Sequence, residues 1–198
     1  MLPVTGPRPD DLAAVVAALR RGAVVGIPTD TVYGLAADPF SREAVALLFS
    51  LKRRPAVKAI PILAASIGQA ERVGVLTGPA RQAAERHWPG ALTLVVGRVP
   101  GLPDWVGNPA RDSVGIRVPD HPAALALLAE AGPLAVTSAN RSGAAPAADD
   151  AGARAIFAGG VAAYLSGAGA GGAPSTVVDF TGRAPCLLRA GPVAWEGA

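Results

Sequence analysis

The sequence predicts a single α/β domain with a twisted, mixed β-sheet flanked by helices. Three observations predict this class: short apolar strand patterns alternate with helical patterns along the whole chain, no change in composition resembles a linker, and no segment repeats. The chain has 198 residues, of which 51% are hydrophobic and 17% charged. This is the composition of a packed globule, so we expect one domain over residues 1–198.

The first two expected elements are a helix and a strand. Residues 10–21 carry apolar side chains at helical spacing, with Asp10 as the expected N-cap and Gly22 as the closing residue. Residues 23–27 form a short continuous apolar run, which is typical of a strand covered on both faces.

A long polar loop follows this strand. The stretch PTDTVYGL begins at Pro28, and no further element is expected before Ser41. Connections between a strand and a helix usually take only about two to six residues, so this hydroxyl-rich loop is expected to present groups to a ligand. Ser41 is the expected cap of a helix that runs to Leu51, and Pro55 prevents its continuation.

The rest of the chain continues to alternate strands with helices. The expected elements are a strand at 60–63, helices from Ser66 and from Thr77 to about residue 87, strands at 91–96 and 113–118, a helix capped by Asp120 with Pro122 in its first turn, a strand at 134–137, a helix at 149–157, and strands at 161–165, 175–180 and 186–189. Together these elements would supply a sizeable mixed sheet.

Composition also excludes several classes of protein. One cysteine, Cys186, rules out an internal disulfide framework and indicates a reducing cytoplasm. His87, His121 and Cys186 are too widely spaced to predict a zinc site. No apolar run is long enough to span a bilayer, no signal-peptide pattern is expected, and neither a G-x-G-x-x-G nor a P-loop motif occurs.

The positive charge is distributed unevenly between arginine and lysine. The net charge of +3 permits an anionic partner such as a nucleotide or RNA. Only two of the 18 basic residues are lysines, Lys52 and Lys58, and both lie in one short window. In a chain that otherwise uses arginine, a retained lysine indicates a site that needs a compact ammonium group.

Several expected strands end in polar loops, where α/β proteins tend to bind ligands. These loops are PTDTVYGL, Ser138-Ala139-Asn140 and the Gly171-Gly172 loop before Ser175. With the cationic segment around Lys52, they would supply hydroxyls, an amide and positive charge, which suit phosphate oxygens.

Each of these features also has a structural interpretation. Residues 52–54 could complement the dipole of a helix C-terminus. Thr29, Asp30 and Thr31 could cap a turn, and Ser138 and Asn140 could satisfy their own backbone. On the same grounds, Tyr33 and Trp88 could be core aromatics, Arg117 a surface charge, and His87 and His121 structural side chains.

The order of short motifs resembles that of the YrdC-like family. These motifs are PTDTVYGL, K-x-R-P at 52–55, WPGALTLVV, SVGIRVPDHP, TSANRSG, PSTVVDF and LLRAGPV, between about residues 22 and 193. Members of this family are L-threonylcarbamoyladenylate synthases. These nucleotidyltransferases condense L-threonine, bicarbonate or CO2 and ATP to threonylcarbamoyl-AMP and pyrophosphate, for the threonylcarbamoyladenosine modification of tRNA next to the anticodon.

The resemblance implies a large, positively charged cavity that holds ATP and L-threonine. The implied catalytic residues are Lys52, Arg54, Ser138 and Asn140. The implied ATP-binding residues are Arg54, Lys58, Ser113, Ser138, Pro146 and Arg189. The implied L-threonine-binding residues are Thr31, Leu63, Arg117, Val136 or Thr137, and Ser175. ATP is the implied substrate nucleotide, with Mg2+ but no metal-ligating protein side chain.

This sequence departs from the family pattern at a few positions. Leu63 stands where some relatives carry a histidine near threonine, and WPGA replaces the commoner WPGP. The last family motif lies close to residue 198, so the short family form is expected. Implied partners are tRNA and the proteins that transfer the threonylcarbamoyl group. The alternative functions are a non-catalytic RNA-binding protein and a paralogue that acts on another carbamoylated substrate.

Overall fold

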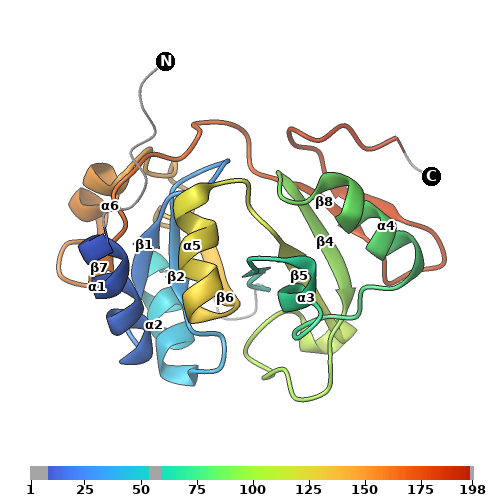
Figure 1. Cartoon of the computed structure of the whole chain (residues 1–198), viewed down its shortest axis with the longest axis horizontal. Coiled ribbons are helices and arrows are strands. Elements are labelled where there is room, and N and C mark those ends of the chain that lie inside the picture. Colours follow the sequence, from blue (N-terminus) through green and yellow to red (C-terminus); the bar gives the residue numbers. More distant parts are fainter. Residues whose placement is uncertain (1–8, 54–58, 197–198) are drawn as a thin grey trace.

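The computed structural model describes residues 9–53 and 59–196, which form a nine-stranded mixed sheet flanked by helices (Figure 1). The strands are β1 Val25–Ile27, β2 Gly34–Ala37, β3 Ile62–Leu63, β4 Leu92–Gly97, β5 Ser113–Arg117, β6 Leu134–Ser138, β7 Ala163–Tyr164, β8 Thr176–Asp179 and β9 Cys186–Arg189. The helices are α1 Pro9–Arg20, α2 Arg42–Lys52, α3 Ile67–Ala70, α4 Gly78–His87, η1 Pro109–Arg111, α5 Pro122–Ala131 and α6 Asp150–Phe157. The predicted α/β class is confirmed.

Neighbours in the sheet come from distant parts of the chain. The strand order is β7-β1-β2-β6-β3-β5-β4-β8-β9. The pairs β1–β7, β3–β5 and β4–β8 are parallel, and the other pairs are antiparallel. The middle strands β6, β3 and β5 therefore join one half of the sheet, built around β1 and β2, to the other, built around β4 and β8.

Alternate side chains along the strands pack into two separate hydrophobic cores. Val25 and Ile27 of β1 pack with α1 and α5, which lie in front of this half of the sheet in Figure 1. Leu35 of β2 belongs to the other cluster, together with buried residues of α2, α4 and α6. Since successive side chains of a strand point to opposite faces, helices on both faces bury strands that are apolar throughout. No helix among the described residues is long and apolar enough to cross a membrane.

Local capping chemistry sets several helix boundaries. The Ser41 hydroxyl accepts a hydrogen bond from the Ala44 N–H, which confirms the predicted cap of α2. The predicted cap at Asp10 is wrong, because α1 begins at Pro9. The predicted cap at Asp120 is also wrong: α5 is preceded by His121, whose side chain makes no capping bond. Proline at the start of α5 already fixes the helical φ and needs no N–H partner.

The sequence prediction missed β2. Residues 34–37 were expected to lie in one long loop, but they pair with β1 on one side and β6 on the other. Four residues that begin with glycine carry little intrinsic strand signal. Pairing on both edges makes them a strand, and that pairing depends on tertiary contacts.

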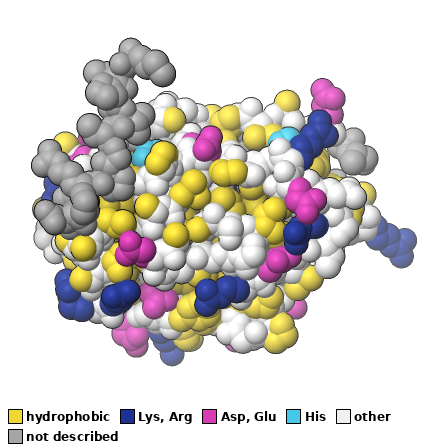
Figure 2. Space-filling view, in the orientation of Figure 1, with side chains coloured by type: hydrophobic (Ala, Val, Ile, Leu, Met, Phe, Trp, Pro, Cys, Tyr) yellow, Lys and Arg dark blue, Asp and Glu magenta, His cyan; other side chains and the backbone are white. Residues whose placement is uncertain are grey.

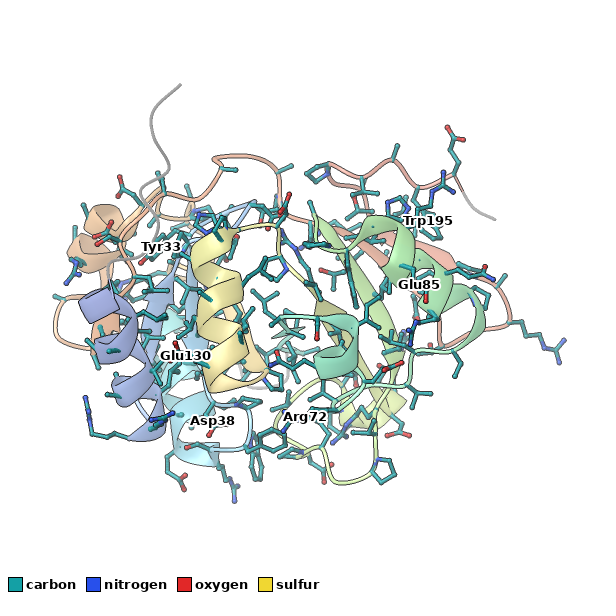
Figure 3. The ribbon with its side chains drawn as sticks, in the orientation of Figure 1. Tyr33, Asp38, Arg72, Glu85, Glu130 and Trp195 are labelled. Atoms are coloured by element: carbon teal, nitrogen blue, oxygen red, sulfur yellow. The ribbon has the colours of Figure 1, made fainter. Side chains whose placement is uncertain are left out.

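Two aromatic residues tie loops and the C-terminal segment to the core. Tyr33 is fully buried, and its hydroxyl donates a 2.7 Å hydrogen bond to the Leu165 carbonyl. Burial raises the pKa of Tyr33 far above its ordinary value, so the hydroxyl stays protonated. Trp195 lies beside the end of α4, with its ring 6.3 Å from that of His87 (Figure 3). Tyr33 and His87 are therefore structural, as one of the two sequence interpretations proposed.

Candidate functional site

A cavity of about 430 Å³ lies across the middle of the sheet. Its floor is one face of the β4, β5 and β8 strands, since alternate residues of each line it: Thr93 and Val95, Ser113, Gly115 and Arg117, and Val177 and Asp179. The residues between them, such as Leu94 and Ile116, belong to the hydrophobic core on the opposite face. Its volume lies within the range of about 300–1,000 Å³ that is typical of small-molecule sites.

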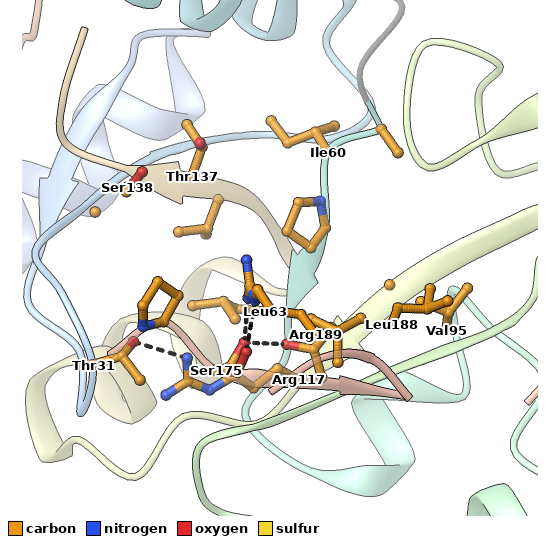
Figure 4. Close-up of a pocket in the computed structure, with 18 of the residues that line it drawn as sticks. Thr31, Ile60, Leu63, Val95, Arg117, Thr137, Ser138, Ser175, Leu188 and Arg189 are labelled. Atoms are coloured by element: carbon orange, nitrogen blue, oxygen red, sulfur yellow. Dashed lines mark hydrogen bonds between the residues drawn. The ribbon is translucent and has the colours of Figure 1, made fainter. Parts of the chain in front are cut away.

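The structure brings most of the sequence-predicted site residues to this cavity (Figure 4). The lining includes Thr31, Leu63, Ser113, Arg117, Val136, Thr137, Ser138, Ser175 and Arg189. Lys52 and Asn140 do not line it but adjoin Ser138 through hydrogen bonds. Pro146 is exposed and lies outside the lining. Arg54 and Lys58 lie outside the described residues.

Arg117 is held rigidly at the end of β5. Its Nε donates to the Gly90 carbonyl at 2.8 Å, its Nη1 donates to Thr31 Oγ1 at 2.9 Å, and its Nη2 donates to the Asp30 carboxylate. The residue is only 5% exposed, which rules out the interpretation as a surface charge. These contacts use three of the five guanidinium N–H groups, so two remain for a ligand oxygen.

The loop that carries Thr31 is held by hydrogen bonds between its own residues, and Gly169 packs closely against it. Thr29 Oγ1 donates to the Val32 carbonyl at 2.7 Å and accepts from the Thr31 N–H, as the turn-capping interpretation predicted. Thr29 and Thr31 nevertheless line the cavity. Gly169 packs behind the loop, where a Cβ would come within 2.5 Å of the Tyr33 nitrogen. Capping and ligand presentation are therefore compatible in this loop.

Lys52 connects α2 to the loop after β6. The side chain is 3% exposed, and its Nζ donates to the Ser138 carbonyl, to the Asn140 carbonyl at 2.8 Å and to Asn140 Oδ1 at 2.9 Å. The end of α2 is closed instead by the backbone N–H of Arg53, which bonds to the Phe49 and Ser50 carbonyls. The lysine therefore does more than complement a helix dipole.

Ser175 links the floor of the cavity to β9. Its hydroxyl lies 2.8 Å from Thr93 Oγ1 and accepts a hydrogen bond from Arg189 Nη2 at 3.1 Å, while its carbonyl accepts from Arg189 Nε at 2.9 Å. Burial and the nearby Arg117 guanidinium lower the pKa of Arg189. Two guanidinium groups that repel each other across a cavity are stabilised when an anion binds between them.

The charged lining residues are mainly basic. Among the described residues that line the cavity, Arg111, Arg117 and Arg189 are cations and Asp179 is the single carboxylate. Sequence reasoning missed Thr93, Asn108, Arg111 and Asp179 as lining residues. The period-2 alternation of Ser113, Gly115 and Arg117 could have indicated the equivalent faces of β4 and β8, but only if the strand pairing had been known. Arg111 lies in η1, outside β5, so strand alternation gives no signal for it.

The described side chains of the cavity do not form a metal site without a ligand. No group of three His, Cys, Asp or Glu side chains gathers within the described ranges. Asp179 is the single carboxylate among the described lining residues, and the other side-chain oxygens there belong to hydroxyl and amide groups, which are also hard donors. Such a set fits a Mg2+ ion that is bound mostly by substrate phosphates.

Comparison with known proteins gives a consistent family and fold. The family model Sua5_yciO_yrdC, described as "Telomere recombination", matches residues 17–191. A Mycobacterium leprae protein named "Putative threonylcarbamoyl-AMP synthase" is 46% identical over 186 residues, which cover 92% of this chain and 84% of that protein. The Bacillus subtilis threonylcarbamoyl-AMP synthase is 38% identical, over 93% of this chain but 54% of its own length.

A solved structure extends the likeness to the fold. The crystal structure of P. abyssi Sua5 complexed with L-threonine superposes with a TM-score of 0.84 at 34% identity. The match covers 91% of this chain and 54% of the P. abyssi chain. This chain therefore spans most of the Mycobacterium leprae relative and about half of the P. abyssi chain.

Proposed function

The chain belongs to the Sua5, YciO and YrdC family, and from that membership we propose that it is an L-threonylcarbamoyladenylate synthase. It would condense L-threonine, bicarbonate or CO2 and ATP to threonylcarbamoyl-AMP and pyrophosphate. The observation that carries this proposal is the cavity itself. Nine residues that the family resemblance assigns to ATP or L-threonine line one continuous space, although they come from four strands and two loops.

The amino-acid half of the site is proposed around Arg117 and Thr31. The two N–H groups of Arg117 that the protein does not use can form a bidentate pair with the threonine α-carboxylate. Asp30 and Gly90 hold the guanidinium from the other side, so its orientation is fixed before the ligand binds. Leu63 and Val136 supply an apolar wall next to these polar groups, against which the threonine methyl group would pack.

The nucleotide half is proposed around Ser138, Ser113 and Arg189. Ser138 donates a 2.5 Å hydrogen bond to Asn140 Oδ1, and Lys52 holds both residues in place. Arg54 and Lys58 would hold the phosphates, while Lys52 would act through Ser138 and Asn140, to which its three N–H groups already bond. Mg2+ would neutralise phosphate charge when it is bound, held mainly by the phosphate oxygens of ATP.

The chemistry needs positioning more than a strong base. The threonine amine reacts with bicarbonate to give an N-carboxylate and water. An oxygen of that N-carboxylate then attacks the α-phosphorus of ATP, and pyrophosphate leaves. This chain's cations would hold the two anions close together and neutralise their repulsion, and phosphoryl-group chemistry depends mainly on such positioning and charge stabilisation.

The proposed cellular context follows from the reaction. The product would pass to proteins that transfer the threonylcarbamoyl group to tRNA, in the cytoplasm. The one cysteine, Cys186, is unpaired and exposed, which is compatible with a reducing compartment.

A non-catalytic RNA-binding protein is the rival function. On the face shown in Figure 2, Lys and Arg side chains are interspersed with Asp and Glu, without the extended basic stripe that tracks a nucleic-acid backbone. The two functions also differ in a simple assay. We expect pyrophosphate release from ATP only when L-threonine, bicarbonate and Mg2+ are all present. Release without an amino acid, or equal release with L-serine, would contradict the proposed synthase.

A further inference from the structure

The hydroxyls of Thr93 and Ser175 form a buried pair on the floor of the cavity. Thr93 on β4 is 7% exposed and Ser175, just before β8, is 6% exposed, yet both line the cavity. Their oxygens lie 2.8 Å apart. The two residues are far apart in the sequence and meet because β4 and β8 pair in parallel, with Leu92 opposite Thr176.

One hydroxyl proton of this pair has no acceptor among the described residues. Two hydroxyls carry two protons, and one of them forms the bond between the two oxygens. Arg189 Nη2 donates to Ser175 Oγ and so fills an acceptor position without using a hydroxyl proton. No other acceptor for either hydroxyl occurs among the described residues. One hydroxyl proton therefore remains for something that enters the cavity.

The neighbouring cation makes this remaining donor strong. The Arg189 guanidinium donates to Ser175 Oγ and to the Ser175 carbonyl, so it fixes the residue and polarises its hydroxyl. A polarised O–H group beside the Arg189 guanidinium suits an anionic oxygen acceptor. In a site for an amino acid, the fitting acceptor is a carboxylate oxygen.

We propose that Thr93 is a positioning residue for substrate binding, which holds the Ser175 hydroxyl so that the pair donates one hydrogen bond to a carboxylate oxygen of L-threonine. This inference rests on the proposed function, because it takes L-threonine as the ligand. The methyl group of Thr93 packs where Gly115 leaves space, 3.4 Å from the position of a Cβ at that glycine. Valine at position 93 would keep this packing and lose only the hydroxyl.

The test is calorimetric titration of the full-length protein with L-threonine. We expect Thr93→Val to weaken binding about fivefold, or about 1 kcal/mol, the usual net contribution of one hydrogen bond. Thr93→Ser restores the hydroxyl and should bind within about twofold of the wild type. Ser175→Ala should weaken binding at least as much as Thr93→Val, and the double variant should be no weaker than Ser175→Ala, since Thr93 acts through Ser175.

The matched control is Thr176→Val. Thr176 is also buried, but its hydroxyl donates to the Val193 carbonyl and the residue lies outside the cavity lining. We expect this change to lower the melting temperature and to leave L-threonine binding within about twofold of the wild type.

Different results would contradict the role of Thr93 and the proposed function. Unchanged binding by Thr93→Val, additive losses in the double variant, or an equal loss of binding in Thr176→Val would overturn the role of Thr93 while the wild type still binds L-threonine. A wild-type protein that binds ATP but no L-threonine would overturn the proposed function, and the inference with it.

Discussion

Replacement of Lys52 by arginine separates two roles for a buried cation. The Lys52 ammonium has three N–H groups, and its contacts include three oxygens on residues 138 and 140. A guanidinium is larger and planar, so its N–H groups cannot converge on three acceptors arranged around one nitrogen. If the cation only complemented the dipole of α2, the exchange would conserve an interaction of about 0.3–1 kcal/mol and change nothing.

The size of the effect follows from these contacts. At least one charge-assisted hydrogen bond should be lost, which costs about 1.5–3 kcal/mol. For a chain of this size, each kcal/mol lowers the melting temperature by about 2–4 °C, so we expect a fall of about 3–12 °C. Displacement of the Ser138 and Asn140 side chains should also lower pyrophosphate release at least about tenfold, which is about 1.4 kcal/mol of transition-state stabilisation.

The assay combines thermal unfolding with threonine-dependent pyrophosphate release. Arg53→Lys, the converse exchange at the exposed neighbouring residue, is the matched control and should leave both measurements unchanged. Wild-type stability and wild-type turnover in Lys52→Arg would refute the anchoring role and restore the helix-dipole interpretation. A tenfold loss of turnover with an unchanged melting temperature would instead indicate that Lys52 contacts the phosphates and does not anchor the loop.

Two further predictions concern the ligand half-sites and the pH dependence of stability. Arg117→Ala should raise the KM for L-threonine far more than the KM for ATP. A larger rise in the ATP KM in steady-state assays would show that the half-sites are reversed. Burial lowers the pKa of the His121 imidazole. Below about pH 6.5 this residue therefore takes up a proton in the unfolded chain more readily than in the folded protein. The free energy of unfolding should consequently fall as the pH drops below that value. Urea unfolding at pH 7 and pH 5.5 measures this loss, which should be smaller in His121→Asn; an equal loss in that variant would rule out His121 as its source.

Features that depend only on neighbouring residues could be predicted from the sequence. The Ser41 and Ser66 caps bond to backbone N–H groups three residues away, so a short window contains both partners. The apolar strands and most helices follow from periodicity, which is also local. The candidate site was predicted mainly through the order of motifs, which placed Thr31, Arg117 and Ser175 in one site without showing how they meet.

Which side chains share the cavity depends on contacts between distant parts of the chain. Thr31 and Arg117 are 86 residues apart, and Thr93 and Ser175 are 82 apart, yet each pair forms a direct hydrogen bond. The short strand β2 exists because β1 and β6 satisfy its two edges. The physical reason is that strand pairing joins segments across long loops, and the register of that pairing determines which face each side chain occupies. Local propensity predicts neither which strands pair nor the register of the pairing. The contacts of Asp30 and Thr93 in the site could therefore be identified only from the structure of the sheet.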